Sequence, residues 1–119
     1  MFLGRPGVGH LVTPRQLVAR TYGATSVTEQ YYCNFGVNPD HTATLASGDL
    51  AIVGSDAEGE VRVVELRSHP FFIGTLFVPQ LRSQVESPHP LILGFLNATQ
   101  NAPPGLTHAL QRTRLAPRR

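Results

Sequence analysis

The sequence predicts an α/β domain, and three stretches of the chain support this prediction. Residues 50–54 and 60–66 are strand-like runs on either side of a short turn-forming segment, a pattern typical of a β-hairpin. Residues 71–77 are dense in aromatic and β-branched side chains, in a run short enough for a buried strand. Residues 87–96 open with two prolines and then place apolar side chains at helical spacing, so they predict a helix.

The chain before the hairpin is less regular. Residues 1–15 are rich in glycine and proline and show no periodicity, so we expect an irregular N-terminal segment. One helical turn at 16–19 and a strand-like run that ends at 31–35 should follow it. Residues 39–47 predict a short helix, because Asn38 is a good N-cap and a proline suits the first helical position.

The C-terminal end differs from the rest of the chain in charge. All ten basic residues are arginine, and four of them lie in the last eight positions, so the remaining six face eight acidic residues. A nucleic-acid interaction would depend on this end alone. It has no aromatic side chain to stack on a base, so nucleic-acid binding is not expected. We divide the chain into an irregular segment (1–15), a globular part (16–102) and an arginine-rich mobile tail (103–119).

The composition bears on the cellular compartment. Apolar residues make up 41% of the chain and charged residues 15%, a balance typical of a globular domain rather than a disordered one. No apolar run approaches the length of a membrane span, and the N-terminus lacks the apolar core of a signal peptide. The single cysteine excludes an internal disulfide. These features predict a cytoplasmic protein without a membrane partner.

A candidate binding site follows the strand predicted at 71–77. Pro79 should end that strand, because proline has no N–H for the ladder and fixes its own φ. Ligands of open α/β sheets lie just beyond the carboxyl ends of strands. We therefore expect any site at residues 78–83, where the Gln80 amide and the Arg82 guanidinium could hold a carboxylate.

Two histidines stand directly before prolines. His69 precedes Pro70 at the start of the predicted strand, and His89 precedes Pro90 at the start of the predicted helix. We expect both side chains to help shape the turns at these points.

Several stretches of the chain resemble one enzyme family. Residues 68–73 (S-H-P-F-F-I) and 76–80 (L-F-V-P-Q) are similar to the D-H-P-F/W-F-V and Q-F-H-P-E runs of class I glutamine amidotransferases, in particular the glutaminase domain of CTP synthase. Three more segments resemble the same domain in order: 22–38 its Y-G…V-x-E-R-H-R-H-R-Y-E-V-N segment, 54–66 its G-x-S-x-D-G-x-x-V-E-x-x-E-L hairpin, and 87–95 its S-P-x-P-L-F-x-G-F helix. The resemblance implies a partial flavodoxin-like fold: the C-terminal half of the domain, with a β-hairpin and a C-terminal helix.

The resemblance also implies that the catalytic groups of the family are lost in this chain. In the family, the His of Q-F-H-P-E is the base that activates a cysteine, and the Glu orients that His. The corresponding residues here are Val78, which cannot carry a proton, and Gln80, which cannot ionise. The G-x-C-x-G motif that should hold the nucleophile does not occur in the sequence. We therefore expect no glutamine hydrolysis by this chain alone.

Other candidate residues each have a structural alternative. Tyr31, Tyr32 and Asn34 replace the basic run that lies near the glutamine pocket of the family, and they either line a remodelled pocket or fill a strand. Cys33 lacks a glycine elbow, so we interpret it as a small buried hydrophobe. The five histidines lack metal-ligand spacing and the acids within 56–60 are typical of a solvated turn, so we expect no metal ion and no cofactor.

Two functions from different classes remain open. The first is a degenerate glutaminase-like domain; in the intact family this domain supplies ammonia from glutamine to a synthase domain that makes CTP. The resemblance does not support binding of L-glutamine here. The second is a protein-interaction module. Half of an α/β domain leaves strand edges and apolar faces uncovered, so we expect a homodimer or a complex with the missing N-terminal half-domain.

Overall fold

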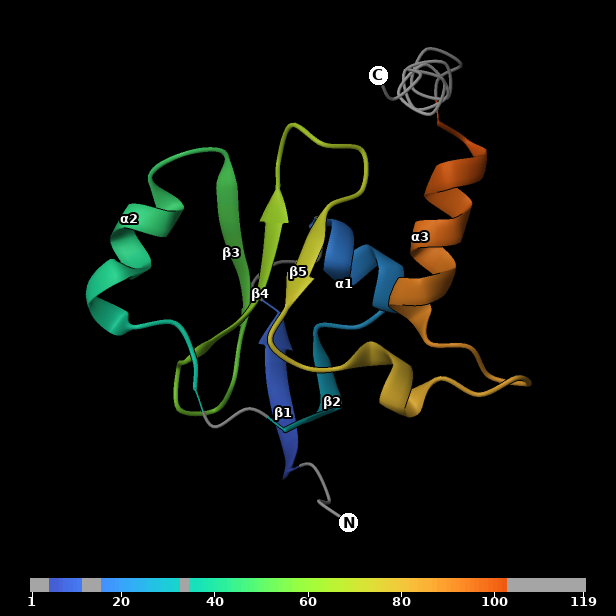
Figure 1. The fold of residues 1–119 in the computed structure, drawn as a ribbon, viewed down its shortest axis with the longest axis horizontal. Coiled ribbons are helices and arrows are strands. Elements are labelled where there is room, and N and C mark those ends of the chain that lie inside the picture. Colours follow the sequence, from blue (N-terminus) through green and yellow to red (C-terminus); the bar gives the residue numbers. More distant parts are fainter. Residues whose placement is uncertain (1–4, 12–15, 33–34, 103–119) are drawn as a thin grey trace, which may run out of the picture.

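The computed structural model describes residues 5–11, 16–32 and 35–102, and within 5–11 it describes the backbone alone (Figure 1). Within these ranges, five strands and five short helices follow one another. In order they are β1 (Arg5–Leu11), α1 (Leu17–Tyr22), β2 (Ser26–Tyr31), the 3-10 helix η1 (Pro39–His41), α2 (Thr42–Ala46), β3 (Leu50–Ser55), β4 (Val61–Leu66), β5 (Ile73–Thr75), the 3-10 helix η2 (Pro79–Arg82) and α3 (Pro90–Gln100). The α/β prediction is confirmed. The arginine-rich tail predicted at 103–119 lies outside the described residues.

The strands form one sheet in the order β2-β1-β3-β4-β5, and every pairing in it is antiparallel. The prediction of an irregular segment over 1–15 is wrong at Arg5–Leu11, which pairs with β2 on one side and with β3 on the other. The strand was not predicted because glycine and proline have low β-propensity. Hydrogen bonding to the neighbouring strands outweighs this low propensity. Pro6 is tolerated because β1 meets β3 only at His10 and Leu11, so Pro6 has one neighbouring strand.

The hairpin of β3 and β4 is confirmed, and its turn is more ordered than predicted. The Asp56 carboxylate accepts hydrogen bonds from the backbone N–H groups of Glu58 and Glu60, at 3.1 and 2.9 Å. It also forms an ion pair with Arg62 Nε at 2.9 Å, and both side chains are buried. The prediction of a solvated turn is therefore wrong for Asp56. Gly59 completes the turn with φ +83°, a conformation that favours glycine.

The strand predicted at 71–77 is much shorter than expected. Only Ile73–Thr75 forms β5, a half-buried strand at one edge of the sheet, antiparallel to β4. The aromatic side chains on either side of it serve other contacts: Phe77 enters the core, and Phe71 packs edge to face on Phe95 of α3. Because the sheet is antiparallel, the rule that places ligands at the carboxyl ends of parallel strands does not support a site at 78–83.

Helices α1 and α3 lie side by side against the sheet, away from α2 (Figure 1). Their inner residues join those of the sheet in a small core: Val18, Ala19, Ala51, Val53, Val63, Phe77 and Leu91. Gly94 permits the close approach, since a Cβ at this position would lie 2.6 Å from Thr21 Cγ2 and 3.0 Å from the Phe71 ring. Within the described ranges, every helix is too short or too polar to cross a membrane.

Candidate functional site

A cavity of about 400 Å³ lies between the edge strand β2, helix η2 and the start of α3. Hydroxyl, charged and apolar groups share its wall: Tyr22, Ser26, Val27, Thr28, Glu29, Arg82, Ser87, Pro88, His89 and Pro90. Two of its acid–base side chains are almost fully buried, because Glu29 is 4% exposed and His89 is 2% exposed. Buried ionisable groups in a cavity mark it as a candidate site.

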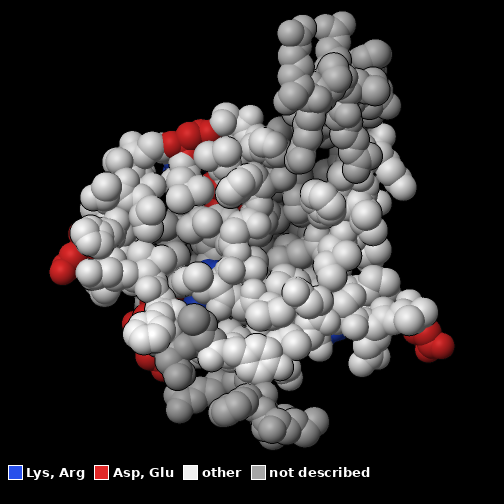
Figure 2. Space-filling model, in the orientation of Figure 1, with Lys and Arg blue, Asp and Glu red and all other residues white. Residues whose placement is uncertain are grey.

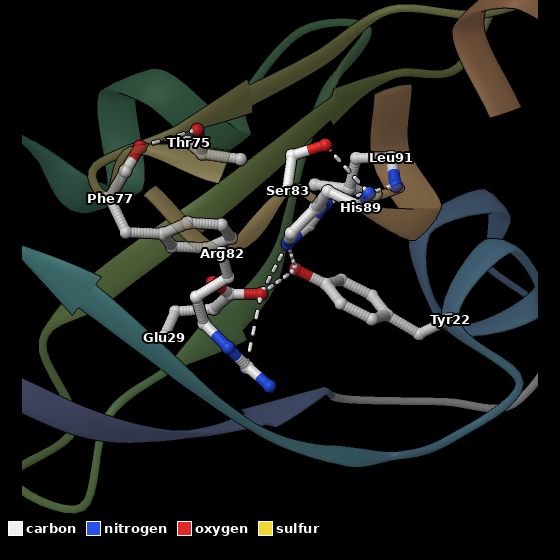
Figure 3. A network of polar contacts seen from close by, with 8 residues as sticks. All are labelled: Tyr22, Glu29, Thr75, Phe77, Arg82, Ser83, His89 and Leu91. Atoms are coloured by element: carbon white, nitrogen blue, oxygen red, sulfur yellow. Dashed lines mark hydrogen bonds and ion pairs between the residues drawn. The ribbon is translucent and has the colours of Figure 1, made fainter. Parts of the chain in front are cut away.

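The Glu29 carboxylate joins four elements at this cavity (Figure 3). Its Oε1 atom accepts a hydrogen bond from the Tyr22 hydroxyl of α1 at 2.6 Å and lies 2.6 Å from His89 Nε2, just before α3. The guanidinium of Arg82, at the end of η2, lies 3.7 Å from the same oxygen. Glu29 itself comes from β2, whose alternation turns its side chain inward between two exposed neighbours.

The hydrogen bonds of His89 fix its tautomer. Its Nδ1 atom accepts from the backbone N–H of Leu91 at 3.1 Å and thereby caps α3. A ring nitrogen that accepts carries no proton, so the proton of the neutral ring is on Nε2 and is donated to Glu29. The backbone N–H of His89 donates to Ser83 Oγ at 3.0 Å. The His89 ring therefore caps α3 and, at the same time, donates a hydrogen bond to a buried carboxylate.

Tyr22 is the second donor to Glu29. It is the last residue of α1, which ends at Gly23 in the left-handed conformation with φ +68°. Burial raises the pKa of the Tyr22 hydroxyl far above its usual value, and the hydrogen bond to Glu29 raises it further. The hydroxyl therefore stays protonated and acts as a donor at neutral pH.

The structure separates the residues predicted at 78–83. Val78 is half-buried, and its backbone N–H donates to the Gln30 carbonyl at 3.2 Å, which ties this segment to the end of β2. Gln80 is exposed and borders a different, mainly apolar cavity of about 260 Å³ beside α3. Arg82 borders the Glu29 cavity. Gln80 and Arg82 therefore do not meet at a common pocket in the way the sequence suggested.

The candidate pocket residues predicted at the end of β2 differ in their surroundings. The Tyr31 ring lies under the Arg62 guanidinium, with 4.4 Å from its Cζ atom to the ring centroid, and packs against the core. Tyr32 is half-exposed, at 51%. Asn34 and Cys33 lie outside the described residues, so the idea of a remodelled pocket stays a prediction. In the described part of the chain, no three His, Cys, Asp or Glu side chains gather where they could hold a metal ion.

Sequence reasoning missed the group formed by Glu29, His89 and Tyr22. The available signals were a lone glutamate at an inward position of a strand and a histidine before a proline. Neither signal predicts which side chain the residue contacts, because Glu29 and His89 are 60 positions apart in the chain.

Comparison with known proteins adds relatives to this geometry. No family model matches the chain. It is 38% identical over 90 residues to a CTP synthase of Rubrobacter xylanophilus, and 37% identical over 98 residues to one of Rhizorhabdus wittichii. These matches cover 75% and 82% of this chain and 16% of each relative, so the chain spans about a sixth of their length.

A solved structure gives the same answer for the fold. The glutaminase domain of Trypanosoma brucei CTP synthase, solved with bound acivicin, superposes with a TM-score of 0.75 at 26% identity. The match covers 85% of this chain and 40% of that one. The fold is therefore that of part of a class I glutamine amidotransferase domain. Within that class, the chain is a relative of the glutaminase domain of CTP synthase.

Proposed function

We propose that this chain is a glutaminase-like pseudoenzyme of the cytoplasm, derived from a domain that supplies ammonia for pyrimidine biosynthesis, and that it does not hydrolyse glutamine by itself. The observation that carries the proposal is Val78 at the position of the family's catalytic base. The Val78 side chain cannot take a proton, and exposed Gln80 cannot orient a base.

The buried histidine of the cavity cannot replace the missing base. His89 has one ring nitrogen engaged with the backbone of α3 and the other with Glu29. A base must be free to take a proton from a nucleophile within hydrogen-bond reach. Using His89 in this way would uncap α3 and remove one of the two hydrogen-bond donors of Glu29, the other being Tyr22.

A glutaminase assay on the purified 119-residue chain tests this proposal. We expect release of ammonia from L-glutamine at the uncatalysed rate, and a CTP synthase glutaminase domain assayed in parallel shows that the assay detects turnover. Turnover well above the uncatalysed rate would overturn the proposal. A Val78→His/Gln80→Glu variant should stay inactive too, because the sequence lacks the G-x-C-x-G nucleophile motif as well. Turnover gained by this variant would assign the loss to these two positions alone.

A second candidate function is a protein interaction, favoured by exposed apolar side chains on and beside α3. Leu93, Phe95 and Leu96 are 43%, 53% and 49% exposed, and Phe72 nearby is 45% exposed. On the face shown in Figure 2, few charged atoms are visible over β5 and over the part of α3 that grey atoms do not cover, and most charged groups lie toward the margins of the face. Uncharged apolar surface of this kind is typical of a contact with another protein. We propose a homodimer, or a complex with the N-terminal half of a glutaminase-type domain.

The oligomeric state separates these possibilities. In light scattering, a dimer of the wild-type chain that becomes a monomer in Leu96→Glu would support self-association through α3. Gln100→Glu is the matched control, because it adds the same charge at an exposed position of the same helix. A monodisperse wild-type monomer would exclude the homodimer and leave the half-domain complex for a binding experiment.

A further inference from the structure

We propose that the cavity beside β2 binds a small molecule bearing a carboxylate, with the Arg82 guanidinium as its anchor. This inference rests on the geometry of the cavity and not on the absence of glutaminase activity. Three features carry it: the unused donors of Arg82, the outer edge of β2 and the position of Glu29.

Arg82 lies beside the buried Glu29 carboxylate, and its side-chain donors are uncommitted within the described residues. Its NH1 atom lies 3.7 Å from Glu29 Oε1, which is an ion pair but is too long for a hydrogen bond. Among the described residues, Arg82 donates no side-chain hydrogen bond, so the planar fork of its guanidinium remains available. The side chain is 47% exposed at the cavity wall. Such a fork matches the two oxygens of a carboxylate.

The edge of β2 adds a backbone donor. The Gln30 carbonyl faces the outer edge of the sheet, because it accepts from Val78 N–H. Alternate residues of a strand present their backbone groups to the same edge, so the N–H of Thr28 faces outward too. Ser26 and Thr28 line the cavity and are exposed. An anion held by Arg82 therefore has the outward N–H of Thr28 as a candidate backbone donor at the strand edge that lines the same cavity.

Glu29 orients Arg82, and its charge limits which ligands fit. Its Oε1 atom already accepts from Tyr22 and His89, so the carboxylate holds the guanidinium without pairing its whole fork. Negative charge placed close to Glu29 is unfavourable, and this disfavours a head group that itself bears more than one charge. A singly charged carboxylate head suits the site better than a phosphate.

Titration of the isotopically labelled 119-residue chain with succinate, L-aspartate and inorganic phosphate tests the proposal by NMR. We expect saturable shifts of the Thr28 amide and of the Arg82 Nε–Hε signal with succinate, and weaker binding of phosphate. Tighter binding of L-aspartate would also support the site and would show that an ammonium group adds to it. Phosphate that binds as tightly as succinate would overturn the assignment to carboxylates.

Variants show whether Arg82 is the anchor. Arg82→Gln should weaken succinate binding by about tenfold or more, and Arg82→Lys should weaken it too, because lysine keeps the charge but lacks the fork. Arg20→Gln is the matched control, since Arg20 is an exposed arginine that does not line this cavity. Dispersed spectra confirm that each variant is folded. Equal affinity in the wild type and Arg82→Gln would overturn the proposal.

Discussion

Two histidine–proline turns in this chain share a local geometry and differ in their surroundings. In both, Nδ1 of the histidine accepts a hydrogen bond from the backbone N–H two residues later, at 3.1 Å: Phe71 N–H for His69 and Leu91 N–H for His89. His69 is exposed and packs edge to face on Phe72. His89 is buried, and its second ring nitrogen meets the Glu29 carboxylate.

The difference lies in the second nitrogen. A helix or turn cap at the surface replaces a hydrogen bond that the same group makes to water in the unfolded chain. Its net contribution to the free energy of unfolding is therefore small. A cap whose ring also partners a buried carboxylate cannot be removed without leaving that carboxylate short of a donor. The same two-residue motif therefore makes a surface turn at His69 and an anchor of the fold at His89.

The largest expected effect comes from replacing the two histidines in turn. His89→Ala removes the cap of α3 and a donor to buried Glu29, and should lower the free energy of unfolding by about 3 to 5 kcal/mol. His69→Ala removes one exposed hydrogen bond and should cost about 0.5 kcal/mol. Urea unfolding followed by circular dichroism measures both.

The pair of variants can also contradict the comparison. Similar losses of stability in both variants would mean that the contribution of each histidine to the free energy of unfolding comes from the local cap and not from the contact with Glu29. A double variant His89→Ala/Glu29→Gln that is no less stable than His89→Ala alone would show that the two effects are coupled, as expected for neighbours in one network. Full additivity would argue that they act independently.

An intermediate effect should come from the close contact between α1 and α3. Gly94→Ala places a Cβ 2.6 Å from Thr21 Cγ2, between α1 and α3, and should cost about 1 to 3 kcal/mol by forcing the helices apart. Gly48→Ala is the control, because a Cβ there meets nothing within 4 Å, and it should be close to neutral. Equal stability of the two variants in urea would show that α3 does not depend on close contact with α1.

The two histidine turns also show what a sequence can predict. Their caps depend on residues within two positions, and the prediction that both histidines shape turns is confirmed. The hairpin and the helix at 90–100 were predictable for the same reason, since their signals are local. The Glu29–His89 contact spans 60 positions, and no local pattern specifies it.

The errors in the predicted fold have the same origin. β1 was missed because glycine and proline dominate Arg5–Leu11, while its pairing depends on strands that lie far along the chain. The site at 78–83 was only partly placed: Arg82 reaches the cavity, whereas Gln80 borders another one. Which side of a segment faces a cavity depends on packing that the sequence does not display directly.

Among the changes made around the Glu29 cavity, the smallest expected effect at neutral pH comes from the other donor to Glu29. Tyr22→Phe keeps the ring and removes the hydroxyl, and should cost about 1 kcal/mol, the usual value of one hydrogen bond. The pH dependence gives a sharper result. Burial and Glu29 raise the pKa of Tyr22 in the folded state above the ordinary value of 10.0, so the unfolded chain loses this proton first.

Stability from Tyr22 is thus fully present below pH 10 and declines as the pH rises above it, because the unfolded state then binds fewer protons than the folded state. The difference in unfolding free energy between wild type and Tyr22→Phe should shrink from neutral pH to strongly alkaline pH. Tyr32→Phe is the control, as its ring is half-exposed. A difference that stays constant across this range would mean that the Tyr22 hydroxyl ionises equally in both states, and would contradict its burial against Glu29.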